Sequence, residues 1–330
     1  MYFFGKNIRK FLFFHQNNLK KYVYIAFMIT CKHNFLSSYL YFLKKIIFQK
    51  FLRGGKEMIA DNHIHTPFCP HGTSDQLEEY VEWFISRKVE EISFTEHAPL
   101  PEGFIDSTPT KDSFMKKELL QLYLDELNKI KQKYKSKIRI NIGLEIDFIE
   151  GFEQETRQFL SEFGTMLDDS ILSVHFIKNG PDYFCIDYSA DYFGYISSVF
   201  GSVSEVYAKY YNAIRKSIVT DLGPYKPKRI GHLTLARKFH LKFPPERSFQ
   251  HEEEALLELV KSNKLALDYN GAGLVKEYCR ESYPPDYLIE KAYRLGIPLV
   301  YGSDAHQVND LGQGYNHLKY QTYFTKPSLL

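Results

Sequence analysis

The sequence predicts a parallel α/β fold, most simply a barrel of seven strands. Two observations support this prediction. From residue 58 onward, seven short apolar stretches alternate with longer stretches of helical periodicity. No internal repeat, low-complexity tract or linker interrupts this alternation. Regular strand–helix alternation favours a parallel sheet covered by helices, and in barrels of this kind the chemistry gathers at the C-terminal ends of the strands.

The predicted elements follow one another along residues 58–304. The candidate strands are 58–65, 91–95, 138–145, 170–176, 229–233, 264–270 and 298–304. The candidate helices are 75–88, 113–135, 152–166, 201–220, 248–262 and 286–295. Residues 182–201 are aromatic and show no clear period, so a long surface loop is predicted there.

Composition limits the classes of function. The chain has 330 residues, of which 25% are charged and 44% hydrophobic, as in ordinary globular proteins. Residues 58–330 hold 31 basic and 39 acidic residues, a net of −8, which gives no electrostatic reason to expect nucleic-acid binding. The four cysteines form no CxxC pair, which favours a reducing compartment and a cytoplasmic location.

Residues 1–57 differ from the rest. Residues 1–56 contain eleven Lys and Arg and no acidic residue, and their apolar runs are too short for a membrane span. A basic membrane-surface helix is one interpretation. The other is that translation starts at Met58, because 53–57 can be encoded by a purine-rich ribosome-binding site. Residues 1–57 are then disordered or an annotation artefact, and 58–330 form the catalytic domain, for which no membrane association is expected.

Residues of metal-ligand type stand at the ends of six of the seven predicted strands. A lone strand-end histidine usually has a structural role, whereas this joint pattern predicts one shared site. Residues two apart on a strand point the same way, so His63 and His65 can face that site together. The strand ends supply His63, His65, His97, Glu145, His175, His232, Asp304 and His306, and His71 follows the first strand in a turn.

The chemistry of these side chains points to a metal centre. Imidazole and carboxylate ligands suit Zn, Mn or Fe, and the thiols are too few for a structural zinc knuckle. Nine candidate ligands exceed what one tetrahedral ion can use, so two or three divalent ions are expected. Such centres hydrolyse phosphate esters or amides, because one ion activates water and its neighbours stabilise the charge that develops on oxygen.

The motifs resemble a known family. HxH on the first strand and the closing Asp-x-His are similar to the PHP (polymerase and histidinol phosphatase) superfamily. Within it, HTPFCPHG, SFTEHAP, GLEIDF, SVHF, GHLTLARKF and GSDAH resemble the monofunctional histidinol-phosphate phosphatases, from residue 58 to about 313. The resemblance implies a distorted (β/α)₇ TIM-like barrel. It also implies hydrolysis of L-histidinol phosphate, in histidine biosynthesis, by attack of a metal-bridging hydroxide on phosphorus.

The resemblance also implies an allocation of the nine ligands among three ions. His63, His65, Glu145 and Asp304 would hold the first, and His175 and His232 would share Glu145 to hold the second. The third ion would be held by His71, His97 and His306.

Further roles are assigned to charged residues beside the motifs. Arg237 is favoured over the adjacent Lys238 as the cation that binds the phosphate, since a guanidinium grips phosphate with two hydrogen bonds. Glu96, Asp268 and Asn270 are candidates for the cationic part of the substrate, and Glu96 is equally a partner of a metal-bound histidine. Asp147 suits either purpose.

Several alternatives remain open on the sequence alone. Cys69 is a poor nucleophile candidate, because no CxxxxxR phosphate cradle follows it. A PHP-family phosphoesterase acting on nucleotides, a catalytically silent metal-stabilised PHP module and a binuclear amidohydrolase-type barrel are the rival functions. The sequence fixes neither the metal nor the oligomeric state.

Overall fold

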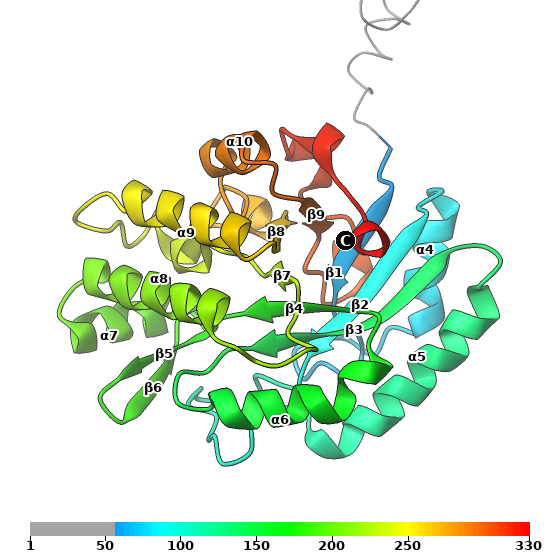
Figure 1. Cartoon of the computed structure of the whole chain (residues 1–330), viewed down its shortest axis with the longest axis horizontal. Coiled ribbons are helices and arrows are strands. Elements are labelled where there is room, and N and C mark those ends of the chain that lie inside the picture. The colour runs from blue at the N-terminus through cyan, green and yellow to red at the C-terminus, as the bar shows by residue number, and fades with distance from the viewer. Residues whose placement is uncertain (1–56) are drawn as a thin grey trace, which may run out of the picture. The chain divides into compact units, whose positions relative to one another are not determined.

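The computed structural model describes residues 57–330, shown in colour in Figure 1. The predictions for residues 1–56 lie outside this described part. Among the described residues, no helix is both long and apolar enough to cross a membrane.

All seven predicted strands are present, and they form one parallel sheet. In spatial order the strands are β1 (Ala60–Ile64), β2 (Glu91–His97), β3 (Arg139–Asp147), β4 (Asp169–Ser173), β7 (Arg229–Ile230), β8 (Ala266–Asn270) and β9 (Leu299–Gly302). The sheet curls until its two edges meet. The amide of Asp304 donates to the carbonyl of His63 at 2.7 Å, and the amide of His65 donates to the carbonyl of Ala305 at 2.9 Å. The predicted distorted (β/α)₇ barrel is therefore confirmed.

Helices surround the outer face of this sheet (Figure 1). They are α4 (Leu77–Ser86), α5 (Leu120–Tyr134), α6 (Glu153–Phe163), α8 (Val203–Val219), α9 (Gln250–Ser262) and α10 (Asp286–Arg294). Each corresponds to a predicted helix, although α5 begins later than expected, after a 3₁₀ turn at Lys117–Leu119. The apolar residues of α5 recur every three or four positions, and Tyr123, Leu127 and Ile130 are buried as that period requires.

The loop predicted for 182–201 is wrong. This segment contains β6 (Asp182–Cys185), which pairs with β5 (Phe176–Asn179) in a hairpin, and the helix α7 (Ala190–Phe200). Ser189 caps α7 by accepting a hydrogen bond from the amide of Tyr192 at 3.1 Å. Its partly polar tyrosines obscured the apolar period, although Phe193 and Ile196 are buried.

A buried ion pair lies between β4 and β7, toward the N-terminal end of the barrel. The Arg229 guanidinium donates to Asp169 Oδ2 at 2.6 Å and to the carbonyl of Asn62 at 2.8 Å. The side chains of Arg229 and Asp169 are 1% and 7% exposed. Burial raises the pKa of Asp169, and the neighbouring Arg229 opposes that rise. Arg229 thus links β7 to both β4 and β1.

Removing this cation should destabilise the barrel. Arg229→Met leaves Asp169 buried without its partner, so we expect unfolding free energy to fall by about 3–5 kcal/mol in urea titration. The double variant Arg229→Met/Asp169→Asn should lose less, because no uncompensated charge remains. Arg157→Met, which breaks an exposed pair with Asp221, is the control and should cost about 0–1 kcal/mol. Equal losses for the two arginine variants would contradict this interpretation.

Candidate metal centre

The first strand carries a bulge where its histidines begin. Asp61 pairs with Ile92 and Ile64 pairs with Phe94, so three steps along β1 match two along β2. Such an additional residue re-aims side chains and is common beside active sites. The Nε2 atoms of His63 and His65 lie 3.4 and 3.6 Å from Glu145 Oε2. The two imidazoles therefore converge on one carboxylate.

Glu145 is the centre of the cluster. His97 is its direct partner in the register of β2 and β3, and His97 Nδ1 lies 3.1 Å from Glu145 Oε2. The Nε2 atoms of His232 and His175 lie 2.9 and 3.8 Å from the other oxygen of this carboxylate, Oε1. Ser173 donates its hydroxyl hydrogen to Oε1 at 2.6 Å. Five imidazoles from four parts of the barrel thus face one carboxylate that is 1% exposed.

The segment after β9 closes the cluster. Asp304 Oδ1 lies 3.2 Å from His65 Nε2 and 3.7 Å from His63 Nε2. Asp304 has a φ of 56°, an uncommon conformation for an aspartate that marks a constrained backbone at this point. The ring of His306 stacks on that of His65 with centroids 3.9 Å apart. Both residues of the predicted Asp-x-His pair therefore reach the site.

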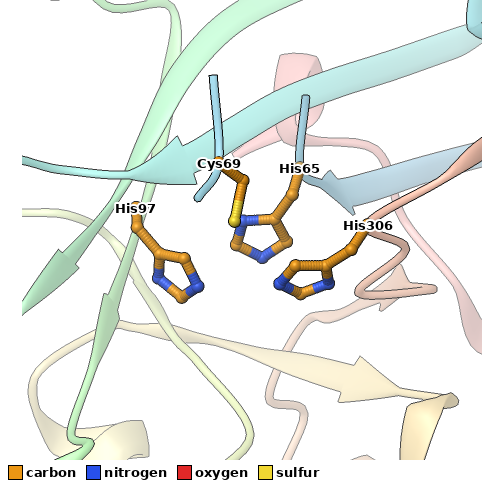
Figure 2. Close-up of side chains that lie close together, drawn as sticks. All are labelled: His65, Cys69, His97 and His306. Carbon is orange, nitrogen blue, oxygen red and sulfur yellow. The ribbon is translucent and has the colours of Figure 1, made fainter. Parts of the chain in front are cut away.

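Cys69 lies closer to this group than the sequence suggested. Figure 2 shows its sulfur directed toward the imidazoles of His65, His97 and His306, and the ligand atoms of all four lie within 4.8 Å of one another. The side chain of His71 is 42% exposed, and its ring centroid lies 6.4 Å from that of His97. Burial raises the pKa of the Cys69 thiol, which disfavours a role as a nucleophile.

Three residues expected to contact substrate lie behind the histidines instead. Asp268 Oδ2 is 2.8 Å from His63 Nδ1, and Glu96 Oε1 is 3.1 Å from His65 Nδ1. Asn270 donates to Asp268 and to Asp304, at 3.1 Å each. Asp268, Glu96 and Asn270 are all 0% exposed. The substrate-contact role predicted for them is therefore corrected: they orient the imidazoles and Asp304, as partners of metal ligands commonly do. The contact with His65 agrees with the alternative role considered for Glu96, as the partner of a histidine.

Asp147 acts in the same way on a further histidine. Its Oδ1 accepts the backbone amide of His175 at 2.9 Å and lies 3.6 Å from the Nδ1 of that ring. Of the two roles that the sequence left open for Asp147, the structure favours orienting a histidine.

Arg237 does not reach the cluster. Its guanidinium pairs with Glu281 through Nε and Nη2, and its Nη1 lies 3.7 Å from the buried Glu253. Glu281 and the α9 residue Glu253 therefore hold it, and Arg237 does not line the cavity, which corrects its predicted contact with phosphate. The neighbouring Lys238 instead lines the cavity beside the histidines. Arg237 and Lys238 both belong to the 3₁₀ segment Leu235–Phe239. Adjacent side chains in such a tight turn point in different directions, so Lys238 faces the cavity and Arg237 does not.

The pKa values of the buried imidazoles are shifted in opposite directions. Burial disfavours a charge on His65, but the neighbouring carboxylates of Asp304 and Glu96 outweigh it and raise its pKa to about 9. For His97, burial and the cationic His65 together lower the pKa to about 4, despite Glu145. Burial disfavours ionised Glu145 too, yet the surrounding imidazoles hold its pKa well below the usual value. The centre therefore presents ionised carboxylates between imidazoles.

The geometry fits bound cations. Within the described residues, His63 Nε2, His65 Nε2, His97 Nδ1 and Glu145 Oε2 are buried and have no hydrogen-bond partner. Leaving four such atoms unpaired is costly unless something else binds them. Imidazole nitrogens and carboxylate oxygens facing one another at 3.1–3.6 Å are the donor set of a Zn, Mn or Fe site. A cavity of about 350 Å³ opens onto this cluster.

Comparison with known proteins agrees with this geometry. The family model described as PHP domain matches residues 61–272. The histidinol-phosphatase of Bacillus subtilis is 46% identical over 258 residues, which cover 77% of this chain and 96% of that protein. The chain belongs to the PHP-domain histidinol-phosphatases. A probable histidinol-phosphatase of Deinococcus radiodurans, another member of this family, is 32% identical over 77% of this chain and 88% of its own.

Solved structures support the same fold. A putative histidinol phosphatase from Listeria monocytogenes superposes with a TM-score of 0.75 at 38% identity, covering 79% of this chain and all of that one. The histidinol phosphate phosphatase of Lactococcus lactis superposes with a TM-score of 0.57 at 23% identity, covering 76% and 86%. That structure is described as a complex with zinc, L-histidinol and phosphate.

Sequence reasoning missed two residues of the site. Ser173, which binds Glu145, stands two residues before His175 at the end of β4, so its place beside a strand-end histidine was the available signal. Asp187 lines the cavity but follows the unpredicted hairpin, and no pattern in the sequence singled it out.

The orienting carboxylates should control metal affinity. Asp268→Asn weakens the hydrogen bond that fixes the His63 ring, so we expect about 10–100-fold weaker binding of one Zn²⁺ in chelator competition. Asp221→Asn, which alters an exposed carboxylate, is the matched control and should bind as the wild type does. Unchanged affinity in Asp268→Asn would show that the negative charge of Asp268 does not contribute to metal binding.

Proposed function

We propose that this chain is a metal-dependent phosphomonoesterase that hydrolyses L-histidinol phosphate to L-histidinol and phosphate in histidine biosynthesis. One observation carries the proposal: six of the nine predicted ligands line one cavity, and the other three, His63, His65 and Glu145, converge beside them. The identity of 46% to the Bacillus subtilis histidinol-phosphatase, over nearly all of that protein, supports the substrate. A cytoplasmic location stays a prediction.

Two or three divalent ions would occupy the cluster. The first would be held by His63, His65, Glu145 and Asp304. The grouping of His63, His65 and Glu145, and the 3.2 Å between His65 and Asp304, support this set. Bound ions would lower the pKa of a coordinated water and neutralise charge on the phosphoryl oxygens.

The remaining histidines would hold the other two ions. His175 and His232 would share Glu145, whose Oε1 both already face. His97 and His306 would hold the outer ion with His71, as the family resemblance implies. Cys69 is a further candidate ligand for this ion, because its sulfur lies near the nitrogens of His97 and His306.

The surrounding residues would keep the ligands fixed during the reaction. Asp268, Glu96 and Asp147 each bind the far nitrogen or backbone of a histidine, so the imidazoles do not have to reorganise. Ser173 fixes the orientation of the Glu145 carboxylate. Glu145 and Asp304 would act in catalysis as ligands, and Lys238 takes the place of Arg237 as the cation facing the phosphate.

The shape and charge of the site favour a small substrate. Its cavity of about 350 Å³ is the size of a small-molecule site, and residues 58–330 carry a net charge of −8. Repulsion between this acidic body and a polyanion weighs against polynucleotides. The nucleotide-specific and silent-module alternatives therefore become outcomes of the assay below.

The assay is phosphate release from L-histidinol phosphate, with elemental analysis of the same sample. We expect turnover by the full chain that a chelator abolishes and that Zn²⁺ or Mn²⁺ restores, because bound ions would activate the attacking water. Nucleoside monophosphates and glycerol phosphate test substrate class. Preferential turnover of a nucleotide would favour the rival phosphoesterase. Full metal occupancy with no turnover of any ester would favour the silent module.

Glu145→Gln tests the central carboxylate. The amide keeps the shape of the side chain but removes the negative charge that five imidazoles face. We expect lower metal content and a fall in kcat/KM of at least about 100-fold. Glu126→Gln, an exposed glutamate on α5, is the control. Wild-type metal content in Glu145→Gln would remove Glu145 from the set of ligands.

A further inference from the structure

An ion pair stands on the wall of the cavity, separate from the histidine cluster. Lys238 Nζ donates to Asp187 Oδ2 at 3.0 Å and to the carbonyl of Asp187 at 2.7 Å. The side chains of Lys238 and Asp187 are 23% and 20% exposed, and both line the cavity of about 350 Å³ together with His175, His232 and Asp304.

Both members of the pair are charged and held in place. Burial disfavours the ionised form of Asp187, but Lys238, together with His175 and Cys185, outweighs it and lowers the pKa of the carboxyl. Cys185 donates its thiol hydrogen to Asp187 Oδ1 at 3.2 Å, which fixes the carboxylate from the hairpin side. Lys238 stands on the 3₁₀ segment that follows β7, whereas Asp187 stands between β6 and α7. The pair therefore joins the barrel to its inserted hairpin at the cavity wall.

Most other acidic groups at the site already have partners. Glu96, Asp268 and Asp147 bind histidines from behind, and Asp304 faces His63 and His65. Of the three carboxylates that line the cavity, Asp310 accepts from the Gln307 side chain at 3.0 Å. Asp187 is the one whose charged partner is a lysine in the same cavity. Binding of a ligand can break that pair and satisfy both of its charges.

We propose that Lys238 and Asp187 form a recognition pair for a vicinal aminoalkyl phosphate, with Lys238 binding the phosphate and Asp187 the ammonium. This inference rests on the proposed function and deepens it. In L-histidinol phosphate the ammonium is on the carbon next to the one that bears the phosphate ester. The ammonium and the phosphate are therefore close enough together to pair with a carboxylate and a lysine that lie 3.0 Å apart. Exchange of one internal pair for two pairs with substrate leaves no charge unpaired.

The test compares two substrates that differ in the amine alone. L-Histidinol phosphate and 3-(imidazol-4-yl)propyl phosphate carry the same imidazole and phosphate, and the second lacks the ammonium. The wild type should prefer L-histidinol phosphate by about 10–100-fold in kcat/KM, because the analogue has no ammonium to pair with the Asp187 carboxylate. In Asp187→Asn the ratio of the two kcat/KM values should fall to near one, because activity on L-histidinol phosphate is lost. In Lys238→Met, kcat/KM should fall for both substrates and the preference should remain.

The chain offers a matched control pair four positions further along both segments. Lys242 Nζ donates to Asp191 Oδ1 at 2.8 Å, and this pair lies outside the cavity, with Asp191 93% exposed. Asp191→Asn and Lys242→Met remove the same charges from the same two segments. Both should keep the activity and the amine preference of the wild type.

Different results would contradict the proposed function and the recognition pair. No turnover of either ester by the wild type overturns the proposed function. Turnover without amine preference in the wild type, or an Asp187→Asn variant that loses both substrates equally, overturns the recognition pair and leaves the phosphatase intact. Asp187→Glu keeps the charge and should retain the preference, so it decides the matter if Asp187→Asn does not fold.

Discussion

The arrangement of the barrel's C-terminal end depends on one buried carboxylate surrounded by imidazoles. Glu145 is 1% exposed, and a lone ionised carboxylate at such a position is strongly disfavoured. Histidines from β1, β2 and the segments after β4 and β7 compensate its charge, and carboxylates behind several of them fix their orientation. The cluster is thus built in two layers, and removing one member leaves a neighbour unpaired.

Barrel closure and construction of the site use the same backbone. The amides of His65 and Asp304 form the hydrogen bonds that join the segment after β9 to β1, while their side chains face each other at 3.2 Å. Asn270 binds both Asp268 and Asp304 from β8, which couples the adjacent strand to this junction. Loss of closure at this edge would therefore displace two candidate ligands, whereas the Arg229–Asp169 pair stabilises the barrel away from the chemistry.

The sequence was informative wherever a residue's position along a strand decides its direction. His63, His65, His97 and Glu145 were predictable because parallel strands end at one edge and alternate residues share a face. Glu96, Asp268 and Asn270 occupy the same strand ends, yet Glu96 and Asp268 bind histidines from behind and Asn270 binds Asp268 and Asp304. No local pattern separates those orientations. Arg237 and Lys238 differ by a single position in a 3₁₀ turn, so only tertiary contacts with Glu253 and Glu281 decide between them. Asp187 was unpredictable because it follows a hairpin that the aromatic sequence concealed.

The two parts of the site come from different parts of the fold. The candidate metal ligands belong to the seven-stranded sheet and the segments that follow its strands, whereas Asp187 comes from the β5–β6 hairpin and its connection to α7. Insertions between barrel strands tolerate change more easily than the strands themselves, because fewer buried contacts depend on them. A substitution at Asp187 can thus alter which phosphate esters bind without moving Glu145 or its imidazoles. The chemistry of ester hydrolysis and the recognition of the amine are therefore separable, which is why one carboxylate substitution can distinguish them.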